Sequence, residues 1–166
     1  MKLRPATKED YDVLFELFSE IQTLHYESRP DIFKPAKRDK FFNEYFDRVI
    51  ESENHYLMIG FDNDKPFGYI YYVINHLPQN IYRPEKRVIY INHILVTKSC
   101  QGRGFGRALI DHVRDIGQKE TIKEIGLDVW VFNEKAIGFF KKQGFSAYNQ
   151  IMWHVMDEQC RSGCQN

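Results

Sequence analysis

The chain has 166 residues, and its 23 Lys and Arg balance its 23 Asp and Glu, so the formal net charge is zero. Nucleic acids and anionic membranes attract proteins with surplus Lys and Arg, so this balance argues against both as general partners. With 43% apolar and 28% charged residues, the composition also excludes an intrinsically disordered chain. The length suits one domain over residues 1–166, and we expect residues 157–166 to form a loose tail.

The sequence carries neither a secretory signal nor a membrane segment. Residues 1–5 have no apolar run after their positive charges, and no stretch approaches the roughly 18 to 20 apolar residues of a membrane span. The three cysteines, Cys100, Cys160 and Cys164, are too few and odd in number for a disulfide framework. The last two, even with His154, match no standard zinc spacing. We therefore expect a cytoplasmic protein without a metal site.

The first part of the chain predicts one short strand and two helices. Residues 3–6 form the strand, and residues 7–10 have the form of a capping box before apolar residues recur at helical spacing over 11–24. Two prolines within residues 29–35 end this helix. A second helix with an aromatic stripe follows over residues 41–50.

The rest of the chain alternates strands and helices. Strands are expected over residues 56–61, 67–74, 87–96 and 125–132, with a hairpin turn at 62–66 and a closing strand over 147–156. Helices are expected over residues 106–116 and from the N-cap Asn133 through Lys142, with Gly144 ending the second. This order predicts a layered α/β protein with a mixed sheet, antiparallel in its middle, and helices on its faces.

The segment of residues 96–108 joins a predicted strand to a predicted helix through glycines at alternate positions, Gly102, Gly104 and Gly106. Glycine lets the backbone turn tightly and lets a ligand approach it closely. The helix start leaves unpaired N–H groups and the positive end of the helix dipole, which together favour a phosphate or pyrophosphate. Three nearby side chains can add positive charge: Lys98, Arg103 and Arg107.

Other interpretations of this loop fit less well. A Walker P-loop requires Lys and then Ser or Thr after its spacing, and Gly106 is followed by Arg107 and Ala108. A dinucleotide fingerprint starting at Gly102 or Gly104 would end on Arg107 or Leu109, where Gly or Ala is required. A loop without a ligand is disfavoured because three glycines cost conformational entropy.

Residues 101–106 follow the pattern Gln-x-x-Gly-x-Gly, which resembles the acyl-CoA loop of the GNAT family of N-acetyltransferases. Residues 91–96 resemble the central strand of that family, and residues 133–145 resemble its later helix motif with a closing Gly-Phe. The resemblance covers essentially the whole chain in the right order. It implies the GNAT fold, a mixed sheet of six to seven strands with about four helices on its two faces and a splayed central strand pair.

The resemblance also implies an activity. The expected function is transfer of the acetyl group of acetyl-CoA to a primary amine of a small molecule or peptide, by direct attack in a ternary complex. The family often forms homodimers through its late strands, so a homodimer is a possible assembly. The alternative is a non-catalytic acyl-CoA-binding or sensing module on the same fold.

The family pattern assigns cofactor-binding roles by position. The backbone N–H groups of residues 102–107 would hold the pyrophosphate, and the strand edge at 94–96 would bind the pantetheine arm. The amide of Leu95 would polarise the thioester carbonyl, and Asn133 and Phe140 would flank the pantetheine near the thiol. The full set of expected acetyl-CoA contacts is Ile94, Leu95, Val96, Gln101, Gly102, Arg103, Gly104, Phe105, Gly106, Arg107, Asn133 and Phe140.

The sequence departs from the family at the proton-transfer positions. Phe140 stands where the family often has a tyrosine acid, and Tyr90 or Tyr148 are possible replacements. An amine with a pKa near 10 must lose a proton before it attacks, and Asn92 stands where related members often carry a carboxylate. His93 is either the base or a relay, or a histidine packed under a helix. Alternation sends Asn92 and His93 to opposite faces of the strand unless a bulge intervenes.

The acceptor pocket is expected between the first two helices, their connecting loop and the last strands. Cys100 lies in the glycine-rich loop and is not expected to act as a nucleophile. The loop residues that either contact the acceptor or simply lie on the surface are His25, Tyr26, Glu27, Arg29, Asp31 and Phe33.

Overall fold

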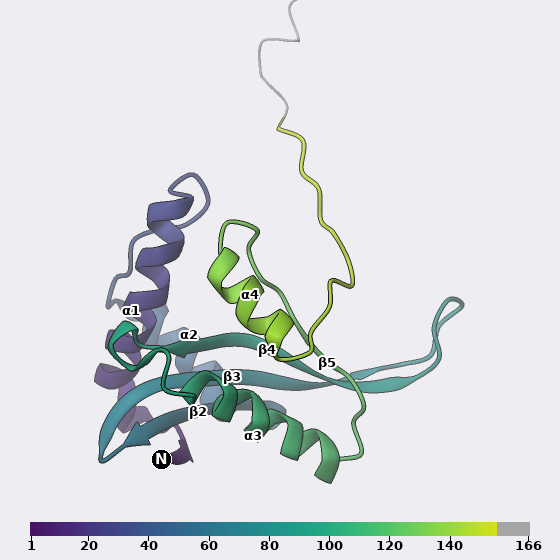
Figure 1. The fold of residues 1–166 in the computed structure, drawn as a ribbon, viewed down its shortest axis with the longest axis horizontal. Helices are drawn as coiled ribbons and strands as arrows, with labels where there is room; N and C mark the ends of the chain where they lie inside the picture. Colours follow the sequence, from purple (N-terminus) through teal and green to yellow (C-terminus); the bar gives the residue numbers. More distant parts are fainter. Residues whose placement is uncertain (156–166) are drawn as a thin grey trace, which may run out of the picture.

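A computed structural model describes residues 1–155 and shows one twisted sheet with helices on both faces (Figure 1). The strands are β1 (Lys2–Pro5), β2 (His55–Asp62), β3 (Lys65–Leu77), β4 (Lys86–Val96) and β5 (Ile125–Leu127). The helices are α1 (Tyr11–Ser28), α2 (Lys40–Glu51), α3 (Phe105–Lys119) and α4 (Glu134–Lys142), with short 3-10 turns η1 (Lys8–Asp10) and η2 (Lys98–Cys100). None of the helices within residues 1–155 has the length and apolar character of a membrane span.

The strands lie in sequence order, β1-β2-β3-β4-β5. Each of the first three pairs antiparallel with the next, and the β2–β3 hairpin turns through Asn63 and Asp64, both with positive φ. Only β5 runs parallel to its neighbour, and it pairs with β4 over just three residues, Ile125–Leu127. The predicted mixed α/β layers are therefore confirmed.

Two strand predictions were wrong. The strand expected over residues 125–132 ends at Leu127, because its pairing with β4 stops at Ile91, just before the irregularity of β4 at Asn92. The closing strand expected over 147–156 is absent from its described part, residues 147–155, which leave α4 as an extended segment without a sheet partner (Figure 1). The sheet within the described residues therefore has five strands, not six to seven. The expected tail at 157–166, with Cys160 and Cys164, lies outside the described residues.

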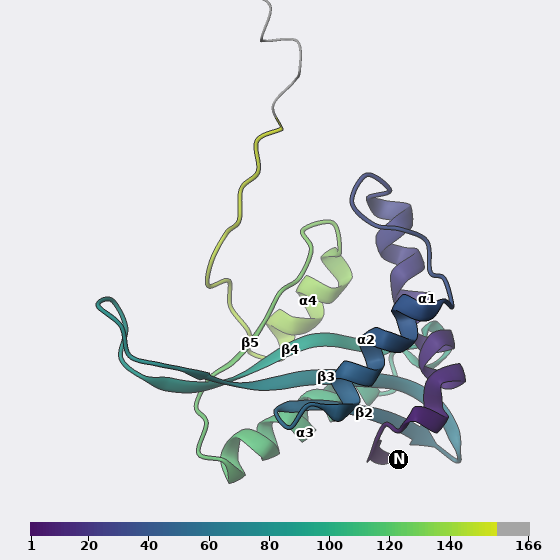
Figure 2. The ribbon, with the colours of Figure 1, turned by 180° about the vertical axis from the view of Figure 1, so that it is seen from behind.

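Each face of the sheet has its own hydrophobic core. Helices α1 and α2 cover one face, and α3 and α4 cover the other (Figures 1 and 2). The aromatic stripe predicted on the second helix does pack inward, with Phe42 and Phe46 buried against Phe18 of α1. On the opposite face, Leu109 and Val113 of α3 are fully buried. The apolar stripes that the sequence predicts on the two early helices and on the two late helices therefore pack against opposite faces of one sheet.

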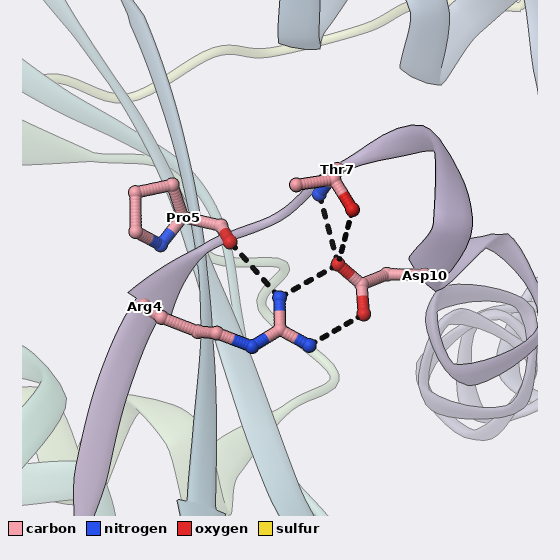
Figure 3. Close-up of polar contacts among 4 residues, drawn as sticks. All are labelled: Arg4, Pro5, Thr7 and Asp10. Carbon is pink, nitrogen blue, oxygen red and sulfur yellow. Dashed lines mark hydrogen bonds and ion pairs between the residues drawn. The ribbon is translucent and has the colours of Figure 1, made fainter.

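An ion pair fixes the chain where β1 leads into α1 (Figure 3). Arg4 donates from both terminal nitrogens to the Asp10 carboxylate, at 2.7 and 2.6 Å. The backbone N–H and the hydroxyl of Thr7 donate to the same carboxylate at 2.9 and 3.1 Å, which confirms the predicted capping box. Asp10 is only 7% exposed. The hydrogen bonds from Arg4 are the main reason that the pKa of Asp10 is lowered to about 2.

We predict that Asp10→Asn lowers the free energy of unfolding at pH 7 by about 2 kcal/mol, because the lowered pKa is a measure of the stability that the charged carboxylate contributes. This contribution is complete above the unfolded-state pKa of 3.8 and is lost as the pH falls through about 2. Urea unfolding between pH 2 and 7 measures it. Asp31→Asn is the matched control, because Asp31 forms an equally bidentate but exposed pair with Arg29 and should change nothing measurable. Equal losses in both variants would contradict the prediction.

Candidate functional site

The site is organised by a β-bulge in β4. Tyr71 of β3 pairs with His93 and Tyr72 pairs with Ile91, so Asn92 has no partner across the ladder. A bulge of this kind adds one residue to a strand and bends it. At the same level β5 ends, because its last residue, Leu127, pairs with Ile91. From residue 92 onward the two strands part, so the expected splay is present and β4 presents a free edge over residues 92–96.

The direction of the backbone amides along this edge follows from one hydrogen bond. The Thr97 N–H donates to the Phe67 carbonyl of β3 at 2.9 Å. Successive amides of a strand point to opposite edges, so the Leu95 N–H faces β3, and the N–H groups of Ile94 and Val96 face the free edge. This geometry corrects the expected role of Leu95: the amides that can reach a ligand at this edge are those of Ile94 and Val96.

The glycine-rich loop follows directly on this edge. Gly102 and Gly104 have φ of +77° and +86°, a backbone conformation that favours glycine, and a Cβ at either position would meet no atom within 4 Å. Helix α3 starts at Phe105, and its first internal bond runs from the Ala108 N–H to the Gly104 carbonyl at 3.1 Å. The preceding amides, of residues 105–107, point out of the helix end. The loop therefore has the open space and the donors of the predicted anion site.

The third glycine serves a different purpose. A Cβ on Gly106 would lie 3.1 Å from Cζ of Phe139 on α4. Glycine at this position therefore lets α3 and α4 approach each other closely. The sequence pattern singled out Gly106 as part of the acyl-CoA loop and gave no sign of this packing role.

The two arginines of the loop are placed differently. Arg103 donates to Asp62 Oδ2 at 2.8 Å and lies over the Phe105 ring, 4.8 Å from its centroid. Arg107 lies 3.4 Å from Asp111 one helical turn on, and its side chain is mostly exposed. Gln101 turns back and donates from Nε2 to the Val96 carbonyl at 3.1 Å. Of the two arginines, Arg107 is therefore the one more free to turn toward a bound phosphate.

The start of helix α4 is capped as predicted, but Phe140 within the helix is placed differently from what was expected. Asn133 Oδ1 accepts from the Ala136 N–H at 3.1 Å, so Asn133 is the predicted N-cap. Phe140 is 7% exposed and packs edge to face against Phe139 and Phe145. Its ring belongs to the core under α3 and α4, which leaves little of it for contact with a ligand.

His93 lies on the α2 side of β4 in a cage of three tyrosines. Its ring stacks on Tyr45 at a centroid distance of 6.1 Å, and the Tyr71 ring meets it edge-on at 5.7 Å. The Tyr69 hydroxyl lies 3.3 Å from Nδ1. Burial, and to a smaller degree the neighbouring His25, lower the pKa of His93 to about 4. His93 is therefore neutral at physiological pH, which favours the packed interpretation, whereas Asn92 is exposed.

The two tyrosines expected as replacement acids differ in position. Tyr90 pairs with Gly126 at the base of the splay, where a Cβ on Gly126 would lie 3.2 Å from the Tyr90 ring. Burial, with the Asp128 carboxylate beside it, raises the pKa of Tyr90. Tyr148 is 86% exposed on the extended segment after α4. Asp128 was not among the residues singled out from the sequence, because only the pairing of β5 with β4 reveals its place.

An aromatic bridge joins the α1–α2 loop to the segment after β5. His25 stacks on Phe33 at 4.8 Å, Phe33 meets Trp130 at 5.0 Å, and Trp130 stacks on Phe132 at 6.0 Å. Two of the six expected acceptor residues, His25 and Phe33, are therefore brought together beside the site. The other four, Tyr26, Glu27, Arg29 and Asp31, are exposed. The Arg29 guanidinium donates to the Asp31 carboxylate.

A cavity of about 500 Å³ lies beside the tyrosine cage, between α2 and strands β2 and β3. Tyr45 and Tyr71 belong to both its wall and the cage around His93. Its wall also carries Arg48 and His55, and the His55 ring is hydrogen-bonded to the Tyr71 hydroxyl at 2.8 Å. The face of β4 that holds His93 is thus next to a hollow whose wall carries several polar side chains.

The family model of the Acetyltransferase (GNAT) family matches residues 16–145, most of the chain, so the protein belongs to this family. An uncharacterized N-acetyltransferase of Methanocaldococcus jannaschii is 29% identical over 143 residues, which are 86% of this chain and 59% of that relative. The chain thus spans about three fifths of the length of that relative.

Two solved structures show the same fold. A tetramutant of the BH1408 protein of Bacillus halodurans has a TM-score of 0.88 at 24% identity, over 94% of this chain and 100% of that chain. The acetyltransferase AAC(6')-Iy, in complex with the bisubstrate analogue CoA-S-monomethyl-acetylneamine, has a TM-score of 0.72 at 15% identity, over 94% of this chain and 97% of that chain. The predicted GNAT fold is therefore confirmed.

We predict that His93 titrates near pH 4 rather than near its ordinary 6.5, because its cage excludes water from the charged ring. Between these values the unfolded state takes up the proton first, so the free energy of unfolding should fall as the pH falls from 6.5 toward 4. NMR titration of the His93 ring measures the midpoint. Tyr45→Leu removes the stacked ring and should raise it. A midpoint near 6.5 in the wild-type protein would contradict the prediction that the cage excludes water from the ring.

Proposed function

We propose that this protein transfers the acetyl group of acetyl-CoA to a primary amine of a small molecule or a peptide, by direct attack in a ternary complex. The observation that carries the proposal is the continuity of two binding elements. The open loop at Gly102 and Gly104, with the α3 amides behind it, leads directly onto the free edge of β4, which ends at the bulged Asn92. A long ligand with a pyrophosphate at one end and an amide-containing arm fits this path.

Each part of the path suits one part of acetyl-CoA. The amides of residues 105–107 and the α3 dipole would bind the pyrophosphate. The pantetheine arm would add to β4 as an extra strand, through the outward amides of Ile94 and Val96. An amide aimed at the thioester oxygen stabilises the negative charge that develops there during attack, and Ile94, the outward residue nearest the bulge, is the residue to which we assign this role.

Direct attack by the amine agrees with the position of Cys100, the free cysteine within residues 1–155. The Cys100 thiol is in η2, before the loop, where hydrogen bonding with Thr97 lowers its pKa. It is thus placed toward the pyrophosphate end of the path and away from the bulge. A covalent acyl-enzyme would need a nucleophile at the thioester end of the path instead.

A second candidate function has its own observations. Phe140 is packed in the core where the family often has a tyrosine, and Asn92 stands at a position that often carries a carboxylate. A module that binds or senses acyl-CoA without turnover would need neither group. Assay of acetyl transfer over a panel of small amines and peptides separates the two functions: turnover on any amine supports the enzyme, and tight CoA binding with no turnover supports the sensor.

We predict that Arg107→Glu weakens CoA binding about tenfold, because it replaces a positive with a negative charge at the α3 N-terminus. Lys119→Glu, at the other end of the same helix, is the matched control and should leave the affinity unchanged. Calorimetric titration with CoA measures both. NMR shifts on CoA binding should map to residues 94–96 and 102–107. Binding that prefers NAD or NADP, or shifts elsewhere, would contradict the proposed site.

We also propose a homodimer, supported by the segment after α4. Ile151, Met152, Trp153 and Val155 are between 70% and 89% exposed on an extended backbone. Contiguous apolar surface of this kind marks an interaction site. We predict that sedimentation of the wild-type protein gives the mass of a dimer and that Trp153→Glu shifts it to the 19.8 kDa monomer. Wild-type protein that sediments as a monomer at all concentrations would contradict the dimer.

A further inference from the structure

One carboxylate stands at the point where β4 and β5 part. Leu127 is the last residue of β5 and pairs with Ile91, so the next residue, Asp128, lies at the level of the bulged Asn92. Asp128 is exposed, and no ion pair joins it to a Lys, Arg or His side chain within residues 1–155. Its charge is therefore available to a ligand that reaches the base of the splay.

Tyr90 lies beside this carboxylate, on β4. A Cβ on Gly126 would lie 3.2 Å from the Tyr90 ring, and the Tyr90 hydroxyl lies beside Asp128. The raised pKa of Tyr90 keeps its hydroxyl protonated, so the hydroxyl can donate to the Asp128 carboxylate.

The other groups near the bulge are less suited to accept the proton of an ammonium ion. Asn92 has no basic atom at neutral pH. His93 is enclosed by Tyr45, Tyr69 and Tyr71, and its Nδ1 faces the Tyr69 hydroxyl. His25 is stacked on Phe33 within the aromatic bridge. Asp128 is the one carboxylate that the register of the sheet places at this level.

We infer that Asp128 is the catalytic base of the transfer and that Tyr90 is a positioning residue that orients its carboxylate. The inference rests on the proposed function. The negative charge of Asp128 would attract the acceptor as its ammonium ion, at the end of the β4 edge where the thioester would lie. The preferred acceptor is therefore a cationic alkyl amine.

The protons, bonds and charges of the transfer balance with the groups present. The ammonium ion gives one proton to the Asp128 carboxylate, and the nitrogen lone pair forms a bond to the thioester carbon. The carbon–sulfur bond breaks with its electron pair going to sulfur. The nitrogen then gives a second proton to the thiolate, directly or through water, and Asp128 returns its proton to the solvent. The products are the acetamide, the CoA thiol and one proton.

The test compares two acceptors that differ in their need for a base. An alkyl amine is protonated at pH 7, whereas hydroxylamine is already neutral. Asp128→Asn should lower kcat/KM for the alkyl amine at least 100-fold and for hydroxylamine less than tenfold, because general-base catalysis contributes about 10² to 10⁴. Asp128→Glu should recover part of the loss. Glu124→Gln removes a carboxylate at the other end of β5, where it binds Lys86, and should change neither rate.

Ultraviolet titration of Tyr90, taken as the difference between the wild-type protein and Tyr90→Phe, gives a readout without turnover. Tyr90 should ionise above its ordinary pH, and Asp128→Asn should lower its pKa. No change in that pKa would overturn the positioning role. Equal loss on both acceptors, or no loss on either, would overturn Asp128 as the base while leaving the proposed function intact. A wild-type protein that binds CoA tightly but acetylates no amine or peptide of the panel would overturn the proposed function and the base with it.

Discussion

The site depends on one local constraint, the extra residue at Asn92 in β4. A strand with no bulge would continue beside β5 and satisfy both of its edges within the sheet. Because β4 bends at Asn92 and β5 ends at Leu127, the amides of Ile94 and Val96 face outward without a neighbouring strand. Such an edge readily accepts another extended chain. The loop at Gly102 and the α3 N-terminus lie directly beyond this edge, so under the proposed function a single irregularity in the ladder would determine where a long, polar ligand binds.

The charge balance is consistent with this arrangement. A protein with no net charge must bind a polyanion through local groups. Those available here are backbone amides, a helix dipole and exposed cations such as Arg107. Arg103 is less available, because it donates to Asp62. Under the proposed function, specificity for a pyrophosphate would come from geometry and not from net charge. At the opposite end of the path, the one exposed carboxylate at the splay favours a cation.

The features that the sequence predicted well are those encoded by neighbouring residues. The capping box at Thr7, the N-cap at Asn133 and the glycine turn at Gly102 each depend on residues within a few positions. The features it could not predict depend on register between distant segments. The bulge at Asn92, the place of Asp128 and the packing of Gly106 on Phe139 all require knowledge of which residues face each other across strands or helices. The missing closing strand is of the same kind, since an apolar, extended sequence forms a strand only where an edge receives it.

The aromatic bridge has a consequence for parts of the chain that are distant in sequence. It connects α1 and the loop after it to the segment that leaves β5, through the contacts of Phe33 with Trp130 and of His25 with Phe132. Each such pair contributes about 0.5–1.5 kcal/mol beyond its buried area, so separating the two segments costs about 1 to 3 kcal/mol. The two segments are therefore coupled in energy, and a substitution at either end of the bridge is felt at the other.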